Sequence, residues 1–203
     1  MRTITKSVYE ITELSPEAKE TAYNIWLAKI DHVFYDQDWQ ELIKQVEICF
    51  NIDVTACNID PDGRSYIKYD DYLEEHMTEL SGKRLRSYIW NNFRYLWENK
   101  YYCNYKTLKN RRSKFLVTSQ DCPLTGVFCD NAVMDVIENL WTCHDNYITY
   151  ADLIECIINS ICHGWTADIE YHRSEEFFIS ECAAQELYFS ADGKEMYYSS
   201  ELD

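Results

Sequence analysis

The chain has 203 residues, with 19 Lys and Arg against 35 Asp and Glu, and so a formal net charge of −16. Its 46% hydrophobic and 15% aromatic content excludes an intrinsically disordered chain, because that much apolar surface can offset the entropy lost on folding. Five Gly and three Pro exclude collagen-like and low-complexity classes, and at this length we expect a single domain over residues 1–203.

The first elements are a short strand over residues 7–11 and a helix that follows it. Ser15 is a favourable N-cap, Pro16 suits the first helical position, and Glu17 suits the positive end of the helix dipole. Apolar residues at spacings of three and four then continue to about Asp31.

A second helix and a hairpin come next. Asp36 or Asp38 is the expected cap of the helix, which carries apolar residues at helical spacing. Residues 52–59 alternate as a strand does, and residues 65–69 return after a turn over residues 60–63, which reads Asp-Pro-Asp-Gly.

The middle of the chain is expected to be helical. Residues 72–80 predict a short helix, and residues 85–102 predict a longer one followed by a basic loop over residues 105–114. The apolar stripe of the longer helix consists of Leu85, Ile89, Phe93, Leu96 and Trp97.

Three further helices are expected in the last third. Asp130 or Asn131 caps the first, Thr149 caps the second, and Ser174 starts the third. Residues 188–198 contain a Gly turn between two short strands and predict a hairpin. The expected fold class is α+β, a mostly helical single domain with one or two small β-hairpins.

Nine cysteines occur, and no apolar run of signal-peptide length occurs in the first twelve residues. We therefore expect reduced thiols in a cytosol, where a buried Cys behaves as a small apolar residue. No run of residues is apolar and long enough for a transmembrane helix.

The sequence contains no pattern that predicts catalysis or a metal site. No C-x-x-C pair, no G-x-S-x-G and no phosphate-binding Gly-rich loop occurs. The adjacent pairs Cys143-His144 and Cys162-His163 do not by themselves indicate a dyad. We expect no enzyme, no cofactor and no metal, and a hydrolase whose site the sequence hides is the least favoured reading.

Charge is unevenly distributed along the chain. Residues 83–114, here called the basic segment, carry ten basic residues and one acidic residue, whereas the flanking parts have net charges of −10 and −15. Arginines interleaved with aromatic residues suit single-stranded or structured nucleic acid, although docking on the chain's own acids would also explain the segment. The candidate partner-binding residues here are Lys83, Arg84, Arg86, Trp90, Arg94, Lys109, Arg111, Arg112 and Lys114.

Acidic residues near the last helices form a second candidate surface, represented by Glu170, Glu175 and Glu176. Such an array can imitate the phosphates of nucleic acid and occupy a basic groove, and it can also serve solubility alone. Because the net charge is strongly negative, we expect that duplex DNA is not the primary ligand.

Three stretches resemble a family of small acidic proteins from phages, prophages and mobile elements. Residues 9–19 resemble its Y-x-[FI]-x-E-L-S-x-E-A-K start, residues 122–126 its C-P-L-T-G segment, and residues 186–194 its E-F-x-x-D-G-K ending. The matches lie at both ends and in the middle of the chain. Members are sometimes labelled antitoxins of a stability system.

The resemblance implies an accessory protein of a mobile element in the cytoplasm of a bacterial host. We therefore expect an inhibitor of host defence, of the anti-CRISPR type, that binds a nucleic-acid-guided nuclease or its guide RNA complex through charged surfaces. The alternative is an antitoxin-like or accessory protein-binding module with no defence target.

Overall fold

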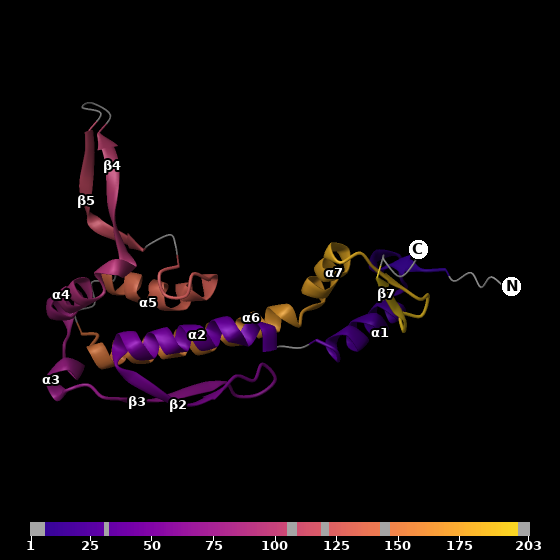
Figure 1. The fold of residues 1–203 in the computed structure, drawn as a ribbon, viewed down its shortest axis with the longest axis horizontal. Coiled ribbons are helices and arrows are strands. Elements are labelled where there is room, and N and C mark those ends of the chain that lie inside the picture. Colours follow the sequence, from indigo (N-terminus) through magenta and orange to yellow (C-terminus); the bar gives the residue numbers. More distant parts are fainter. Residues whose placement is uncertain (1–6, 31–32, 105–108, 119–121, 143–146, 199–203) are drawn as a thin grey trace. The chain divides into compact units, whose positions relative to one another are not determined.

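The computed structural model describes residues 7–30, 33–104, 109–118, 122–142 and 147–198 (Figure 1). Contacts divide the chain into two compact units. The terminal unit comprises residues 1–34 and 168–203, and the central unit comprises residues 35–167. Each unit is described by itself.

Helices predominate in the described residues. The α-helices are α1 (Pro16–Leu27), α2 (Val33–Phe50), α3 (Glu75–Thr78), α4 (Gly82–Asn92), α5 (Asn131–Thr142), α6 (Tyr150–His172) and α7 (Glu175–Ala184). The 3-10 helices are η1 (Ile11–Glu13), η2 (Arg94–Leu96) and η3 (Phe128–Asp130). The strands are β1 (Tyr9–Glu10), β2 (Ile52–Asn58), β3 (Tyr66–Asp71), β4 (Trp97–Asn104), β5 (Lys109–Thr118), β6 (Leu187–Phe189) and β7 (Met196–Tyr198).

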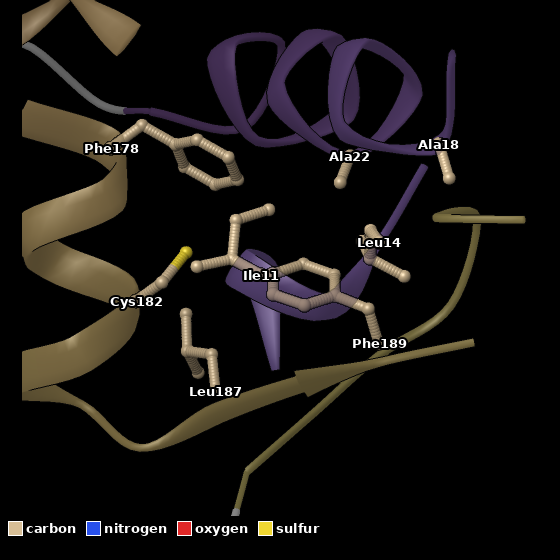
Figure 2. Close-up of a cluster of buried hydrophobic side chains, with 8 residues drawn as sticks. All are labelled: Ile11, Leu14, Ala18, Ala22, Phe178, Cys182, Leu187 and Phe189. Atoms are coloured by element: carbon tan, nitrogen blue, oxygen red, sulfur yellow. The ribbon is translucent and has the colours of Figure 1, made fainter. Parts of the chain in front are cut away.

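The terminal unit joins the two ends of the chain in one antiparallel sheet of order β1-β6-β7. Tyr9 pairs with Phe189, and Leu187 pairs with Tyr198. Helices α1 and α7 cover a small core, in which apolar side chains from both ends of the chain meet (Figure 2). The core residues are Ile11, Leu14, Ala18, Ala22, Phe178, Cys182, Leu187 and Phe189.

The turn between β6 and β7 packs closely on α1. Gly193 has a φ of +72°, and a Cβ added there would lie 2.1 Å from the carbonyl oxygen of Ala18. The residues that resemble the family's N-terminal and C-terminal motifs therefore touch each other, since Ala18 lies in the first motif and Gly193 in the last. Glycine is required there both by the backbone conformation and by the close approach.

In the central unit, α2 packs against α6 through two stacked indoles. The Trp39 and Trp165 ring centroids are 6.3 Å apart with nearly parallel planes, and the Trp165 Nε1 donates to the Asp36 carboxylate at 2.9 Å. A Cβ on Gly164 would lie 2.7 Å from the Trp39 ring, so the absence of a side chain there allows the helices to approach. Further buried residues of this unit come from α2, α4, α5 and α6, including Leu42, Val46, Leu85, Ile89, Val133, Ile137, Ile154, Ile157 and Ile161.

Helix α6 begins at a reciprocal cap. The Thr149 amide donates to the Asp152 carboxylate at 2.9 Å, and the Asp152 amide donates back to the Thr149 hydroxyl at 3.1 Å. Each residue thereby satisfies a backbone donor that the first helical turn leaves unpaired. The next residue, Tyr150, is 1% exposed and its ring lies 5.2 Å from that of Tyr88.

The C-P-L-T-G segment is a loop closed by a buried carboxylate. Asp130 is fully buried, and its carboxylate accepts from the Leu124 amide at 2.8 Å, the Thr125 amide at 3.0 Å and the Thr125 hydroxyl at 2.7 Å. Asp130 was one of two predicted caps of the following helix. Helix α5 begins directly after it at Asn131, while the carboxylate bonds backward to this loop, which gives the segment a structural role.

The α+β, mostly helical fold class is confirmed, with small hairpins at β2–β3 and β6–β7 as expected. The extent of a single domain over residues 1–203 stays a prediction. No helix in the described part of the chain has the length and apolar character needed to cross a bilayer.

Three predicted elements differ from the structure. The helix expected over residues 85–102 ends at Asn92, and residues 97–104 and 109–118 pair as a third hairpin, β4–β5, where a helix and a loop were expected. Residues 105–108 of that expected loop lie outside the described residues. The helix expected to be capped by Asp36 or Asp38 already begins at Val33. Asp36 therefore lies inside the first turn, where it binds the Trp165 indole.

Candidate nucleic-acid interface

The structure divides the described residues of the basic segment between a helix, a short 3-10 turn and two strands. Lys83 and Arg84 are exposed in the first turn of α4, and Arg86 and Trp90 are half-buried farther along it. Arg94 is exposed in η2. All of these residues belong to the central unit.

The prediction that Arg86, Trp90 and Arg94 share one helix face is wrong for Arg94, because α4 ends at Asn92. The Asn92 amide group donates to the Tyr88 carbonyl at 2.9 Å, a contact in which a side chain takes a helix carbonyl. Phe93 then leaves the helical conformation. The turn nevertheless places the Arg94 guanidinium over the Trp90 ring, 5.7 Å from its centroid, which is cation–π geometry.

The remaining basic candidates lie in β5, which the sequence predicted as a loop. The backbone register pairs Arg111 with Tyr102 and Arg112 with Tyr101, and we call these two adjacent pairs the Tyr–Arg rungs. β4 and β5 pair only with each other in the described residues, as a two-stranded ribbon (Figure 1). Lys109 begins the strand and Lys114 lies beyond the rungs.

The exposed cations of α4 and η2 are not neutralised by the chain's described acids. Lys83, Arg84 and Arg94 form no ion pair with any carboxylate that the structure describes. Lysines elsewhere do form such pairs, with Lys44 at 3.4 Å from Glu41 as one case. Among the described residues, none of these three cations therefore docks on one of the chain's own acids.

The acidic candidates occupy the terminal unit, at the corner between α6 and α7. Glu170, Glu175 and Glu176 are all exposed. The Ser174 hydroxyl caps α7 by accepting from the Phe177 amide at 3.1 Å, and the two glutamates of the first turn suit the helix dipole. Part of this acidity thus has a local structural reason.

Sequence reasoning missed the aromatic side chains beside these acids. Tyr171 is 52% exposed, and its ring lies 5.5 Å from that of Phe177 and 5.4 Å from that of His172. The sequence signal for these side chains was the alternation of acidic and aromatic residues between positions 168 and 178.

The basic candidates lie in the central unit, whereas the acidic candidates lie in the terminal unit.

A small hollow of about 20 Å³ lies in the terminal unit among Ile11, Lys19, Glu175, Phe178 and Ile179. A cavity of this size holds about one water molecule and is too small for an organic substrate. It therefore adds no small-molecule site to the surface at Glu175.

The cysteines whose side chains are described are free thiols. Burial raises the pKa of Cys129 to about 11 and that of Cys182 to about 12, so both remain protonated thiols near neutral pH. Among the described residues, no group of three or more His, Cys, Asp or Glu is placed to hold a metal ion. Cys143 and His144 lie outside the described residues.

Comparisons of the chain with protein-family models, curated proteins and solved structures find no match. The resemblance to the family of mobile-element proteins accordingly stays a prediction.

Proposed function

We propose that the chain is a non-enzymatic inhibitor from a phage or mobile element, which binds a nucleic-acid-guided nuclease of the bacterial host through its charged surfaces. One observation carries the proposal: a chain of net charge −16 gathers ten of its 19 cations in residues 83–114 and leaves Lys83, Arg84 and Arg94 exposed without described counter-ions. An unneutralised patch of one sign on a protein of the other sign is typical of a partner surface.

The expected partner is a protein–nucleic acid complex, because such a complex presents both signs of charge. The basic segment would contact its nucleic acid, and the acidic corner at α6–α7 would contact basic protein surface. Charged residues at the rim of an interface mainly set the association rate and the specificity of binding. The proposal therefore implies binding that weakens as ionic strength rises.

The test is affinity purification of the tagged protein from a host with and without a CRISPR locus, followed by cleavage assays with the purified effector. The expected result is capture of a nuclease complex only where the locus is present, and loss of cleavage at stoichiometric inhibitor. Capture of no nuclease, together with unaffected cleavage, would overturn the proposal.

Charge variants refine this test. Lys83→Gln/Arg84→Gln/Arg94→Gln is expected to raise the inhibitor concentration for half-maximal effect about tenfold or more, since each lost contact to phosphate weakens binding. The matched control is Lys29→Gln/Lys44→Gln/Arg64→Gln, which removes the same charge from exposed positions outside the segment. Equal effects of both variants would show that net charge alone acts.

The exposed Tyr171 ring beside Glu170 favours a second candidate, an antitoxin-like or accessory module that binds a protein with no role in defence. Aromatic side chains are enriched at the energetic centres of protein interfaces. Under this alternative, Tyr171→Ala abolishes capture of the partner, whereas the triple variant in the basic segment leaves capture unchanged.

A further inference from the structure

We infer that the described residues of α4 and η2 bind single-stranded nucleic acid, with the Trp90–Arg94 pair as a stacking platform for unpaired bases and the exposed Lys83 and Arg84 as contacts to phosphate. The inference deepens the proposed function and rests on the same surface, but it concerns the ligand of that surface alone. It can therefore be tested without any nuclease.

The platform is held in place by buried neighbours. Phe93, 4% exposed, lies between Trp90 and Arg94 in sequence and stacks on Phe50 with ring centroids 5.2 Å apart. Tyr88 packs edge-on against Phe93 at 6.2 Å and belongs to this anchor. Trp90 keeps part of its surface accessible, and Arg94 is exposed beside it.

The cations at the start of α4 have no evident role in the helix itself. Lys83 and Arg84 lie in its first turn, where the helix dipole disfavours positive charge. That turn contains no acidic residue, and the Ser81 side chain makes no capping hydrogen bond. The helix would be more stable with acids at these positions, which indicates that the cations serve a ligand.

The ribbon β4–β5 carries the same residue types. Its backbone register sets Arg111 opposite Tyr102 and Arg112 opposite Tyr101. Arginine and tyrosine are residue types that contact phosphate and stack on bases.

Unpaired bases fit this surface better than a duplex does. Base stacking requires exposed base faces, which a duplex hides. A duplex also brings twice the phosphate charge per length against a chain of net −16, whose terminal unit alone has a net charge of −9. An acidic protein would satisfy the cations but would leave the aromatic platform unused.

The test is fluorescence anisotropy of the full chain with labelled rU12, dT12 and a 12-base-pair duplex, at 50 and 200 mM salt. We expect either single strand to bind at least tenfold more tightly than the duplex, and the preference between rU12 and dT12 distinguishes RNA from DNA. Duplex binding as tight as single-strand binding, equal binding of heparin, or no single-strand binding at 50 mM salt would overturn the inference.

Variants separate stacking from charge. Trp90→Leu keeps an apolar side chain and is expected to weaken single-strand binding about 5- to 100-fold, whereas Trp90→Phe restores most of it. The matched control is Tyr66→Leu, which removes the ring of another cation–π pair, the one under Lys68, and is expected to have less than a twofold effect. Lys83→Gln/Arg84→Gln/Arg94→Gln is expected to reduce the slope of log affinity against log salt by about 2.

Circular dichroism melting confirms first that each variant is folded. If Trp90→Leu does not fold, Arg94→Gln, on an exposed residue of the same pair, carries the test. Binding equal to that of the unsubstituted chain in all the folded variants of the basic segment would overturn the inference.

The outcomes are distinguishable from those of the proposed function. Single-strand binding without inhibition of the nuclease leaves this inference standing and removes the proposed function. Inhibition without single-strand binding overturns this inference and leaves the inhibitor acting through protein contacts.

Discussion

Asp130 shows how one buried carboxylate can organise a loop. It accepts hydrogen bonds from two backbone amides and one hydroxyl, all contributed by Leu124 and Thr125. Without this acceptor, the partly buried amide donors of Leu124 and Thr125 would be left unpaired, which costs more than the hydrogen bonds themselves contribute. The C-P-L-T-G loop is therefore explained by its contribution to the stability of the fold.

We expect Asp130→Ala to lower the free energy of unfolding by about 2–4 kcal/mol, because it empties a buried site and leaves partly buried donors without an acceptor. Urea denaturation measures this change. The control is Asp135→Asn, on the exposed side of α5, with an expected change within about 0.5 kcal/mol. Equal effects of the two variants would contradict the structural role of Asp130.

Two glycines with positive φ provide a matched pair. Gly193→Ala adds a methyl group 2.1 Å from the Ala18 carbonyl oxygen, whereas Gly126→Ala, at φ +83°, meets nothing within 4 Å. We expect Gly193→Ala to lower the free energy of unfolding by about 3 kcal/mol or more, because backbone strain and steric overlap act together. Gly126→Ala is expected to lower it by about 1 kcal/mol, from backbone strain alone. Thermal unfolding of both variants checks the order, and a larger loss at Gly126 would contradict it.

Thiol reactivity follows burial. Near pH 8 about a thousandth of Cys129 is thiolate, given its raised pKa of about 11, and the side chain is 1% exposed. We expect iodoacetamide to modify the exposed Cys57 and Cys156 long before Cys129 and Cys182, as peptide mass spectrometry of partly labelled native protein would show. The same protein in urea, where all four should react, is the control, and early modification of Cys182 would contradict its burial.

At the scale of elements, the hairpin β6–β7 depends on an acidic turn. The Ser190 hydroxyl and the Lys194 amide donate to the Asp192 carboxylate at 2.7 and 3.2 Å, and they hold its pKa at about 2. A carboxyl whose pKa is lower in the folded than in the unfolded chain stabilises the fold above its unfolded pKa and loses that contribution as pH falls toward the folded value.

We therefore expect the stability difference between the unsubstituted chain and Asp192→Asn to shrink as pH falls from about 5 to 2. Urea unfolding of both proteins at several pH values measures it. A difference that stays constant over this range would show that the turn does not favour the ionised carboxyl.

Residues 85–118 show where pattern reasoning about elements succeeds and where it fails. Four residues of the predicted apolar stripe lie in the core, since Leu85, Ile89, Phe93 and Leu96 are all 4% exposed or less. The side chain of Trp97, the fifth, lies outside what the structure describes. The continuation of the stripe as one helix was wrong, because a 3-10 turn preserves the spacing of three between Phe93 and Leu96 after the α-helix has ended. Aromatic residues in β4 and the F-L-V-T end of β5 favour strands, and this β preference prevails there.

At the scale of the whole molecule, charge opposes folding in both units. The terminal unit has 6 basic and 15 acidic residues, and the central unit has 13 and 20, which give net charges of −9 and −7. The ion pairs that the described residues form are mostly exposed, such as Lys44–Glu41, and exposed pairs contribute about 1 kcal/mol or less each. Repulsion among the excess carboxylates therefore outweighs what these pairs contribute.

We expect the Tm to rise by a few degrees between 10 and 150 mM sodium chloride, because screening weakens this repulsion more than it weakens the exposed pairs. Calorimetry measures the change, and potassium chloride is expected to give the same result if the effect is one of screening. A Tm that falls with salt would contradict the argument.

The sequence by itself determined the helix caps at Ser15, Thr149 and Ser174, two of the hairpins and the apolar stripe over residues 85–96, because these depend on local hydrogen bonds and on the spacing of apolar residues. It also located the basic segment, because charge is counted without a fold. Only the tertiary structure decided that the Arg94 guanidinium lies 5.7 Å from the Trp90 ring centroid, that Arg111 and Arg112 lie opposite tyrosines in the strand register, and that Gly193 touches Ala18. The first contact depends on the turn that follows α4, the second on the register of two strands, and the third on the packing of a hairpin turn against a helix. All three are set by backbone geometry and not by the spacing of residues along one helix.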